Sequence, residues 1–347
     1  MVLVVNGAYD DSGHEDPGHP ERPDRVNAAR AAIADLQLGR DLIVVEPYAA
    51  TRADLTRVHA GGYLDELGAY CYGGGGDLDP DTYATFDSWS IATQAAGAGL
   101  AVIQELQRRE EGVGFVVARP PGHHALSDRA MGFCLLNNVA IAAAALRDQG
   151  ERVLIVDWDV HHGNGTQAIF WDDPRVLYVS THQWPLYPGT GSASEVGGAH
   201  AIDSVVNIPL PPGATGDVLG RAIHEVAAPV IDAFDPTWVL VSAGFDAHRA
   251  DPIAELQLAS NDFADLTRSV ANFAPRPGRL ALFLEGGYEL EALRSSIRAT
   301  LSAALGEVSP DDRSHGGPGV EQILRTQSAR RAAIELLHAT KEEEEAP

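Results

Sequence analysis

The chain has 347 residues, of which 45% are hydrophobic and 21% charged, and its formal net charge is −24. The composition is typical of a soluble globular protein, and no run of 18 apolar residues indicates a membrane span. A chain this acidic lacks the basic surface that nucleic-acid binding needs. We therefore expect neither a nucleic-acid nor a membrane partner. The acidity would favour cationic ligands, or it would simply keep the protein soluble.

The compartment is predicted from the N-terminus and the cysteines. Residues 1–6 lack a basic region and a cleavage site, and they are better interpreted as a first strand than as a signal peptide. The two cysteines, Cys71 and Cys134, are far apart, which argues against a disulfide framework. Both features fit a reducing, cytoplasmic environment.

Short apolar runs rich in β-branched residues alternate with Ala-rich helical stretches along the chain. This alternation predicts an α/β fold with a mainly parallel sheet covered on both faces. The predicted strands are Val2–Val5, Leu42–Val45, Gly114–Ala118, Val153–Val156, Val176–Ser180, Val205–Ile208, Trp238–Ser242 and Leu280–Leu284, and the predicted helices are Arg25–Leu36, Ser90–Arg109, Asn137–Gln149, Gly216–Phe234 and Asn261–Phe273.

No linker divides the middle of the chain, so we predict one domain over residues 1–310 and a C-terminal extension over residues 311–347. Within the extension, Asp311–Gly319 is predicted as a loop, and the acidic tail from Lys341 as partly disordered. The glycine run Gly73–Gly76 has no lysine or helix cap suited to phosphate, so it is predicted to be a mobile loop.

The strongest motif begins at the end of the predicted strand 153–156 and runs Asp157-Trp-Asp159-Val-His161-His162. In extended chain Asp157, Asp159 and His161 point the same way, because side chains alternate with a period of two. An Asp-x-His pair can present one oxygen and one nitrogen to a single cation. The alternative, a polar loop that caps a strand, does not explain so many metal-competent residues in six positions.

A zinc site needs a third protein ligand and leaves one position open for water. The best candidate is Asp246, which follows the predicted strand 238–242 through small residues. Ligands of open α/β sheets lie outside the carboxyl ends of the strands, where neighbouring loops converge. Taken alone, Asp246 would be a helix N-cap or turn residue about as often as a ligand.

Two further strand ends carry candidate catalytic groups. Pro120-Pro121-Gly122 stiffens and then turns the chain before His123 and His124, a pair better explained as acid–base machinery than as surface residues. Tyr288 follows two glycines after the strand 280–284. Alone it would be ordinary, but beside a metal its phenol is a plausible donor to an oxyanion.

These motifs resemble those of the histone deacetylase and acetylpolyamine amidohydrolase superfamily, in the class II-like bacterial branch. The resemblance spans residues 1–306 and implies the arginase/deacetylase fold, a three-layer α/β/α arrangement with an eight-stranded sheet. The motifs that carry it, in chain order, are His19-Pro-Glu-Arg22, Arg119-Pro-Pro-Gly-His-His124, Gly132-Phe-Cys134, Asp157-Trp-Asp-Val-His-His-Gly-Asn-Gly165, Tyr187-Pro-Gly-Thr-Gly191, Ser242-Ala-Gly-Phe-Asp246 and Glu285-Gly-Gly-Tyr288.

By this resemblance one zinc ion lies on Asp159, His161 and Asp246, and the reaction is deacetylation. His124 is then the general base and acid, oriented by Asn164, and Tyr288 donates to the carbonyl oxygen. His123, bonded to Asp157, is the electrostatic companion of His124. A binuclear-manganese ureohydrolase shares the fold by analogy, but the motif at 157–161 lacks the extra bridging carboxylate pattern.

The resemblance also suggests a potassium ion near Asp157, His161 and Ser180, for which the sequence gives only weak independent support. It further suggests a narrow substrate tunnel at Gly132 with Phe133 and Tyr187 as walls, although both aromatic residues could equally be ordinary core residues. The usual second wall is Phe, so Tyr187 would make this tunnel slightly more polar.

The sequence does not decide between the possible substrates. Ile253 falls where polyamine-specific members can carry a gatekeeping carboxylate, so it favours acyl-lysine peptides or small acetylated amines, whereas the acidic charge favours polyamines. Asp77 could bind a substrate amide or ammonium, or be a turn residue. A catalytically weak acyl-lysine binding module is the alternative of another class. A homo-oligomer is compatible with the sequence.

Overall fold

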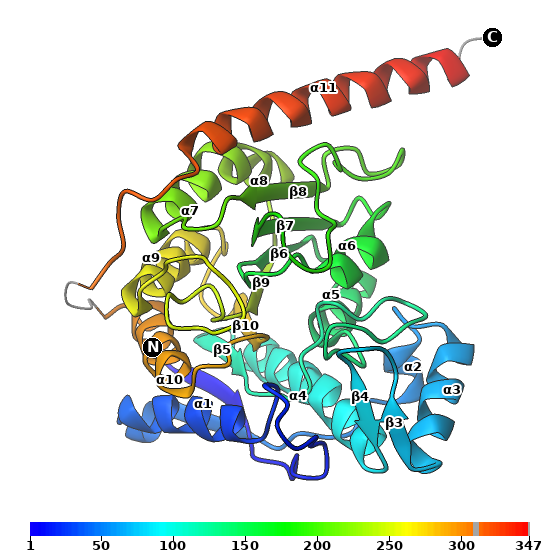
Figure 1. The fold of residues 1–347 in the computed structure, drawn as a ribbon, viewed down its shortest axis with the longest axis vertical. Helices are drawn as coiled ribbons and strands as arrows, with labels where there is room; N and C mark the ends of the chain where they lie inside the picture. The colour runs from blue at the N-terminus through cyan, green and yellow to red at the C-terminus, as the bar shows by residue number, and fades with distance from the viewer. Residues whose placement is uncertain (308–311, 346–347) are drawn as a thin grey trace.

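Eight strands form the central sheet of the computed structural model, which describes residues 1–307 and 312–345 (Figure 1). Every neighbouring pair in this sheet is parallel, and the spatial order is β2-β1-β5-β10-β9-β6-β7-β8. The predicted α/β fold with eight strands is therefore confirmed. The strands are β1 (Leu3–Asn6), β2 (Leu42–Val45), β5 (Val113–Val116), β6 (Val153–Asp157), β7 (Val176–Gln183), β8 (Val205–Leu210), β9 (Trp238–Ala243) and β10 (Leu280–Leu284).

Helices cover both faces of the sheet and make three layers. Side chains of a strand alternate between the faces, so in β6 Leu154 and Val156 pack into one hydrophobic core and Val153 and Ile155 into the other. The first core is covered by α1 (Asp24–Asp35), α7 (Gly216–Ala222), α8 (Ala228–Phe234), α9 (Ser260–Ala271), α10 (Leu290–Ala304) and Ile323 of α11; the second by α2 (Arg52–Leu55), α3 (Gly61–Tyr72), α4 (Ser88–Arg109), α5 (Asn138–Asp148) and α6 (Asn164–Phe170).

The predicted helix Gly216–Phe234 is present as a continuous helical stretch with a change of geometry in its middle. Between α7 and α8 the chain forms a π-helical turn over Ile223–Ala227, and Pro229 follows in the first turn of α8. Proline has no N–H to donate and its ring crowds the preceding turn, so a regular helix cannot continue through it. The predicted bounds 216 and 234 are confirmed, and the π turn before Pro229 is the one irregularity in an otherwise continuous helical stretch.

The glycine run differs from the expected mobile loop. Gly75–Asp77 forms β3, which pairs antiparallel with β4 (Tyr83–Thr85) in a small separate sheet. Gly75 has a φ of +72°, and a Cβ there would lie 2.1 Å from the carbonyl oxygen of Ala84. The glycine thus permits a close pairing of two strands rather than marking a loop.

The C-terminal extension contains a long helix, α11 (Val320–Glu345), which crosses β8 at its start and then extends away from the body (Figure 1). Arg330 anchors it, because its guanidinium donates to the carbonyl oxygen of Val205 at 2.6 Å. The backbone is helical as far as Glu345, and residues 346 and 347 lie outside the described residues. The partial disorder expected for the acidic tail stays a prediction. Residues 312–319 form no helix or strand, as expected, whereas the boundary proposed at residue 310 falls outside the described part and stays a prediction.

No helix in the described ranges is both long enough and apolar enough to cross a membrane.

Candidate functional site

The predicted site residues follow four adjacent strands at the centre of the sheet, β5, β10, β9 and β6. Their carboxyl ends lie at one edge of the sheet because all four strands are parallel. The loops that follow them carry His123 and His124, Tyr288, Asp246, and the motif that begins at Asp157. The sheet topology therefore brings together residues that lie more than 160 positions apart in sequence.

Asp159, His161 and Asp246 form the one group among the described residues whose donor atoms could hold a metal ion. One donor atom from each lies within 4.8 Å of the others, and all three side chains are buried. His161 Nδ1 is 3.1 Å from Asp159 Oδ1 and 3.2 Å from Asp246 Oδ2. Two carboxylates and an imidazole are a donor set that suits zinc, with a position left for water or substrate.

One carboxylate oxygen of the three ligands accepts no hydrogen bond from the described residues, although His161 Nδ1 lies 3.2 Å from it. Asp159 Oδ2 accepts the N–H of Gly286 at 2.8 Å, and Asp246 Oδ1 accepts the N–H of Val160 at 3.0 Å. Asp246 Oδ2 is buried and accepts no hydrogen bond in the described structure. Because buried carboxylate oxygens are normally satisfied, this oxygen fits a role as a metal ligand.

Electrostatics supports the same assignment. Burial works to lower the pKa of His161, but the carboxylates of Asp159 and Asp246 outweigh it and raise the pKa to about 10. Burial raises the pKa of Asp246, and the charge of Asp159 adds to that effect. The cluster therefore strongly favours a positive charge at its centre, which a divalent cation would supply.

Two glycines allow the strand ends to approach the ligands. A Cβ on Gly286 would lie 2.1 Å from Asp246 Oδ2, and one on Gly244 would lie 2.0 Å from Asp159 Oδ2. Any larger residue at either position would displace a carboxylate. The glycines in the two strand-end motifs are therefore required by the ligand geometry.

His123 and Asp157 form a buried ion pair beside the metal ligands. His123 Nδ1 lies 3.0 Å from Asp157 Oδ2, which also accepts the hydroxyl of Tyr178. Burial lowers the pKa of His123, but the charges of Asp157 and Asp159 prevail and raise it to about 10. The two carboxylates thus favour the protonated form of this imidazole.

His124 has the opposite character. Burial, together with the charges of His123 and His161, lowers its pKa well below the ordinary value, so it is neutral near pH 7. Its Nδ1 donates to Asn164 Oδ1 at 2.8 Å, and Asn164 Nδ2 faces the sulfur of Met131. Since the proton is on Nδ1, Nε2 carries the lone pair and can accept a proton.

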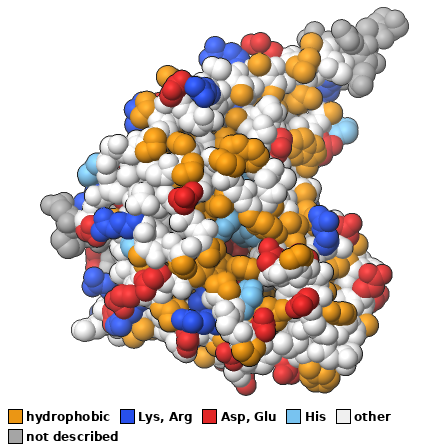
Figure 2. Space-filling model, in the orientation of Figure 1, with side chains coloured by type: hydrophobic (Ala, Val, Ile, Leu, Met, Phe, Trp, Pro, Cys, Tyr) orange, Lys and Arg blue, Asp and Glu red, His pale blue; other side chains and the backbone are white. Residues whose placement is uncertain are grey.

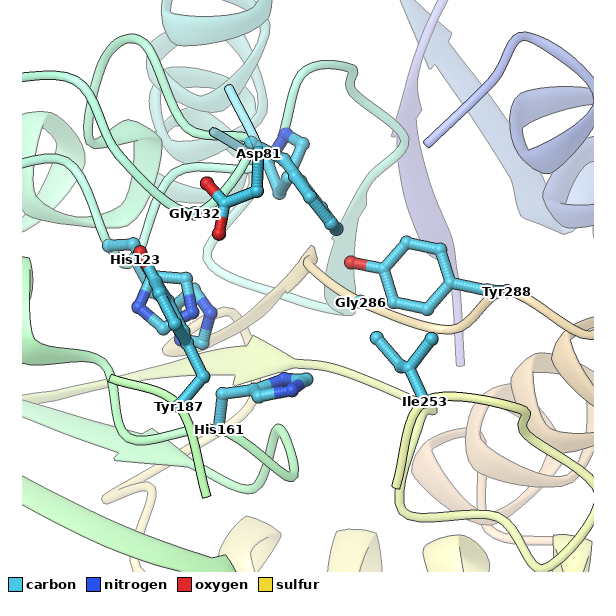
Figure 3. Close-up of a pocket in the computed structure, with 11 residues that line it drawn as sticks. Asp81, His123, Gly132, His161, Tyr187, Ile253, Gly286 and Tyr288 are labelled. Carbon is cyan, nitrogen blue, oxygen red and sulfur yellow. The ribbon is translucent and has the colours of Figure 1, made fainter. Parts of the chain in front are cut away.

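Tyr288 projects its hydroxyl into a cavity above these residues (Figure 3). Its ring packs edge-on against Phe133 with centroids 5.8 Å apart, and the Arg25 guanidinium lies 4.8 Å from the ring centroid. Burial raises the pKa of Tyr288 well above its usual range, against the opposing charge of Arg25. The phenol therefore stays protonated and can donate a hydrogen bond.

The cavity has a volume of about 190 Å³. Figure 2 shows histidine side chains in a hollow near the centre of the face that it draws. Gly132, Phe133 and Tyr187 line it, as the sequence predicted, and Ile253 stands beside Tyr288 (Figure 3). Tyr187 packs edge-on against His124 with centroids 5.1 Å apart. The predicted wall residues thus enclose the approach to the candidate metal ligands.

Asp77 is not part of this cavity. It lies exposed in β3, and the acidic residue that lines the cavity is Asp81, which Figure 3 shows across from Tyr288. The β3–β4 pairing explains the difference, because it directs residues 78–82 rather than Asp77 toward Phe133, whose N–H donates to the Thr82 hydroxyl at 3.1 Å. Asp81, and not Asp77, is therefore the carboxylate placed to meet a molecule in the cavity.

Three residues with clear structural connections to the site were missed from sequence. Glu285 is buried and accepts the N–H groups of Gly122 and His123 at 2.7 and 3.2 Å. Arg25 donates from Nε to the carbonyl oxygen of Gly287 at 2.7 Å, and Asp251 accepts the N–H of Tyr288 at 2.7 Å. A carboxylate directly after a buried strand was a usable signal for Glu285; the other two partners are visible only in space.

The potassium ion stays a prediction. Ser180 is buried, and its hydroxyl lies 3.0 Å from His182 Nδ1. Asp157 already accepts hydrogen bonds on both carboxylate oxygens, from Asp159 N–H on one and from Tyr178 on the other. These contacts neither require nor test an ion there.

Comparison with known proteins agrees with the geometry. The family model of the histone deacetylase domain matches residues 19–304. An uncharacterised protein of Synechocystis is 42% identical over 88% of this chain and 100% of its own length. A histone deacetylase-like amidohydrolase of Pseudomonas aeruginosa is 36% identical over 82% of this chain and 80% of its own.

Among solved structures, the crystal structure of the HDA15 HD domain superposes with a TM-score of 0.85 and 32% identity, covering 100% of this chain and 99% of that one. The likeness confirms the three-layer arginase/deacetylase fold expected from the motifs. With a family model matching most of its length and relatives that share its whole fold, the chain belongs to the histone deacetylase family.

Proposed function

We propose that this protein is a zinc-dependent amidohydrolase that removes an acetyl or short acyl group from an N-acylated amine, with acyl-lysine or a related small amine as substrate. The observation that carries the proposal is that His161 lines the same cavity as His124 and Tyr288, with the carboxylates of Asp159 and Asp246 directly behind it, 3.1 and 3.2 Å from its Nδ1. A zinc ion on that donor set would polarise an amide carbonyl and lower the pKa of a water molecule toward 7.

His124 would move the proton. Its Nε2 carries the lone pair, since Nδ1 donates to Asn164, and its low pKa keeps it neutral and ready to accept a proton from the attacking water. The same nitrogen would then return the proton to the amine that leaves. Proton transfer by a positioned group typically contributes about 10²–10⁴ in rate.

His123 and Tyr288 would stabilise the developing charge. The protonated His123, paired with Asp157, places a positive charge beside His124, where the ring centroids are 4.0 Å apart. Tyr288 would donate its hydroxyl hydrogen to the carbonyl oxygen as that oxygen becomes negative. Phe133 and Tyr187 would hold the alkyl chain of the amine and exclude water from the reacting amide.

A second candidate substrate is an acetylated polyamine. Asp81 favours it, because a carboxylate at the cavity could pair with an amine that stays outside. Ile253 favours acyl-lysine instead, since an apolar side chain there offers no partner to a second ammonium group. We keep acyl-lysine or a small acetylated amine as the first choice.

The test is an activity panel on the full chain loaded with one equivalent of zinc. An acetyl-lysine peptide, free acetyl-lysine, acetylputrescine and acetylspermidine are compared by kcat/KM, with release of acetate as the readout. We expect the acetyl-lysine substrates to be turned over fastest. Preference for the polyamines would replace the first choice with the second, and binding of acetyl-lysine without any acetate release would identify a binding module.

A further inference from the structure

Asp251 connects two loops that lie on either side of the cavity wall. It is buried, and it follows Asp246 by five residues in the loop between β9 and α9. Its Oδ2 accepts the N–H of Tyr288 at 2.7 Å and of Glu289 at 3.3 Å. Its Oδ1 accepts the N–H of Ile253 at 3.3 Å. One carboxylate thereby holds the backbone at two cavity-lining residues, Ile253 and Tyr288.

The segment before Tyr288 has little stiffness of its own. Gly286 and Gly287 precede it, and Gly287 has a φ of +118°, a conformation that favours glycine. The orientation of Tyr288 must therefore be fixed by hydrogen bonds to other parts of the chain. Arg25 supplies one by donating to the carbonyl oxygen of Gly287, and Asp251 supplies the other at the backbone N–H of Tyr288 itself.

Asp251 is well placed to act through the backbone rather than on substrate. It is absent from the residues that line the cavity, whereas Ile253 and Tyr288 stand next to each other there (Figure 3). Its carboxylate also meets the N–H groups that lead into α10, and negative charge is favoured at a helix N-terminus. Each of these contacts locates the carboxylate relative to the base of the Tyr288 side chain.

We propose that Asp251 is a positioning residue that sets the phenol of Tyr288 against the metal ligands and ties it to the cavity wall at Ile253. The proposal rests on the proposed function, in which the Tyr288 hydroxyl donates to the substrate carbonyl. A misplacement of a catalytic group by about 1 Å can cost about 10²-fold in rate, so an anchor at the backbone of that group has a measurable effect.

The test is a double-mutant cycle of Asp251→Asn and Tyr288→Phe, followed by kcat and KM on an acetyl-lysine peptide at fixed zinc content. Asparagine keeps the shape of the side chain but turns one of the two accepting oxygens into a donor. We expect Asp251→Asn alone to lower kcat about 10- to 100-fold and to change KM less than about threefold. In the Tyr288→Phe background the same substitution should cost less than about twofold, because its effect runs through the lost hydroxyl.

Asp262→Asn is the matched control. Asp262 is also a buried carboxylate that accepts backbone N–H groups from two segments, those of Ala259 at 2.7 Å and Ser314 at 3.1 Å, and it does not line the cavity. We expect Asp262→Asn to lower the melting temperature while kcat of the folded enzyme stays within about twofold. Asp251→Glu takes the place of Asp251→Asn in the same cycle if the asparagine variant does not fold.

The outcomes separate the two proposals. Full turnover by Tyr288→Phe would remove the role of the phenol and with it the proposed function as written. If Tyr288→Phe is impaired but Asp251→Asn costs as much in that background as in the native chain, Asp251 does not act through Tyr288 and the positioning proposal is overturned.

Discussion

The cavity has a floor and a rim that are built in different ways. The floor is His161, which lines the cavity, together with Asp159 and Asp246, which contact it from behind. These residues follow the ends of two adjacent central strands, β6 and β9, and backbone N–H groups hold both carboxylates. The rim, Asp81, Tyr187 and Ile253, comes from long connections outside the sheet, and Tyr187 is 36% exposed. The floor is thus fixed by the sheet, whereas the rim depends on how each loop folds.

This difference assigns different tasks to the two regions. The strand ends cannot move without disrupting the core, so they suit chemistry that needs fixed distances. The loops can change without altering the sheet, so they suit the choice of substrate. We therefore expect large losses of turnover from changes in the floor and its supports, and small, substrate-dependent changes from the rim.

The largest expected effect comes from Asp246→Asn. The substitution keeps an oxygen for the N–H of Val160 but replaces the oxygen that has no partner by a neutral amide. Because a bound metal supplies several kcal/mol of charge stabilisation, turnover should fall by about 10³-fold or more and zinc content with it. Metal analysis and acetate release measure both, with Asp232→Asn, an exposed aspartate on α8, as the control. A variant that kept zinc and turnover would remove Asp246 from the floor.

A smaller loss is expected from Asn164→Ala. Without the carboxamide oxygen the imidazole of His124 loses the bond that fixes its tautomer. We expect kcat to fall about 10- to 100-fold while zinc content holds, as is typical of groups that orient a catalytic histidine. An unchanged kcat at full zinc content would mean that His124 is oriented by something else.

Glu21 forms a buried ion pair with Arg25, whose guanidinium lies against the Tyr288 ring, and this pair should affect the stability of the fold at low pH. Burial raises the pKa of Glu21, but Arg119 and Arg25 prevail and lower it from 4.5 to about 2. A carboxylate with a depressed pKa stabilises the fold above its unfolded value of about 4.5, and this contribution is lost as pH falls toward 2. The full loss is about 3 kcal/mol.

Urea unfolding at pH 6 and pH 3.5 tests this contribution. The free energy of unfolding of the native chain should fall more steeply between these pH values than that of Glu21→Gln, which has no carboxyl to titrate. Glu21→Gln should be less stable at pH 6, because Arg25 and Arg119 lose their buried partner. Equal pH slopes in the two proteins would contradict the ion-pair cluster.

The smallest expected effect is at the rim. Asp81→Asn should lower kcat/KM about three- to fivefold for substrates with a positive charge outside the cavity, which is the size of a solvent-accessible ion pair. A neutral acetylated alkylamine should change less than about twofold. Equal changes in kcat/KM for both substrates would show that Asp81 supports the structure of the site rather than recognising the positive charge of a substrate.

The same division explains how much could be predicted from sequence. The eight strands and the ligand set were visible because buried apolar runs end in chemically unusual residues, as at Asp157 and Asp246. At the rim, the family resemblance pointed to Tyr187 and Ile253 but not to Asp81, since Asp77 and Asp81 differ only in how the β3–β4 pair directs the chain. Asp251 was missed because its partners are backbone N–H groups, which no pattern of side chains reveals, whereas Glu285 directly follows the buried strand β10 and could have been found.

The central claim is that the floor holds one divalent ion that the reaction needs. The most direct measurement is a calorimetric titration of the metal-free full chain with zinc, followed by acetate release from an acetyl-lysine peptide at each point. We predict one site per chain and turnover that rises in proportion to its occupancy. Zinc binding that saturates at one per chain with no turnover of any N-acetyl amine, or no binding at all, would contradict it.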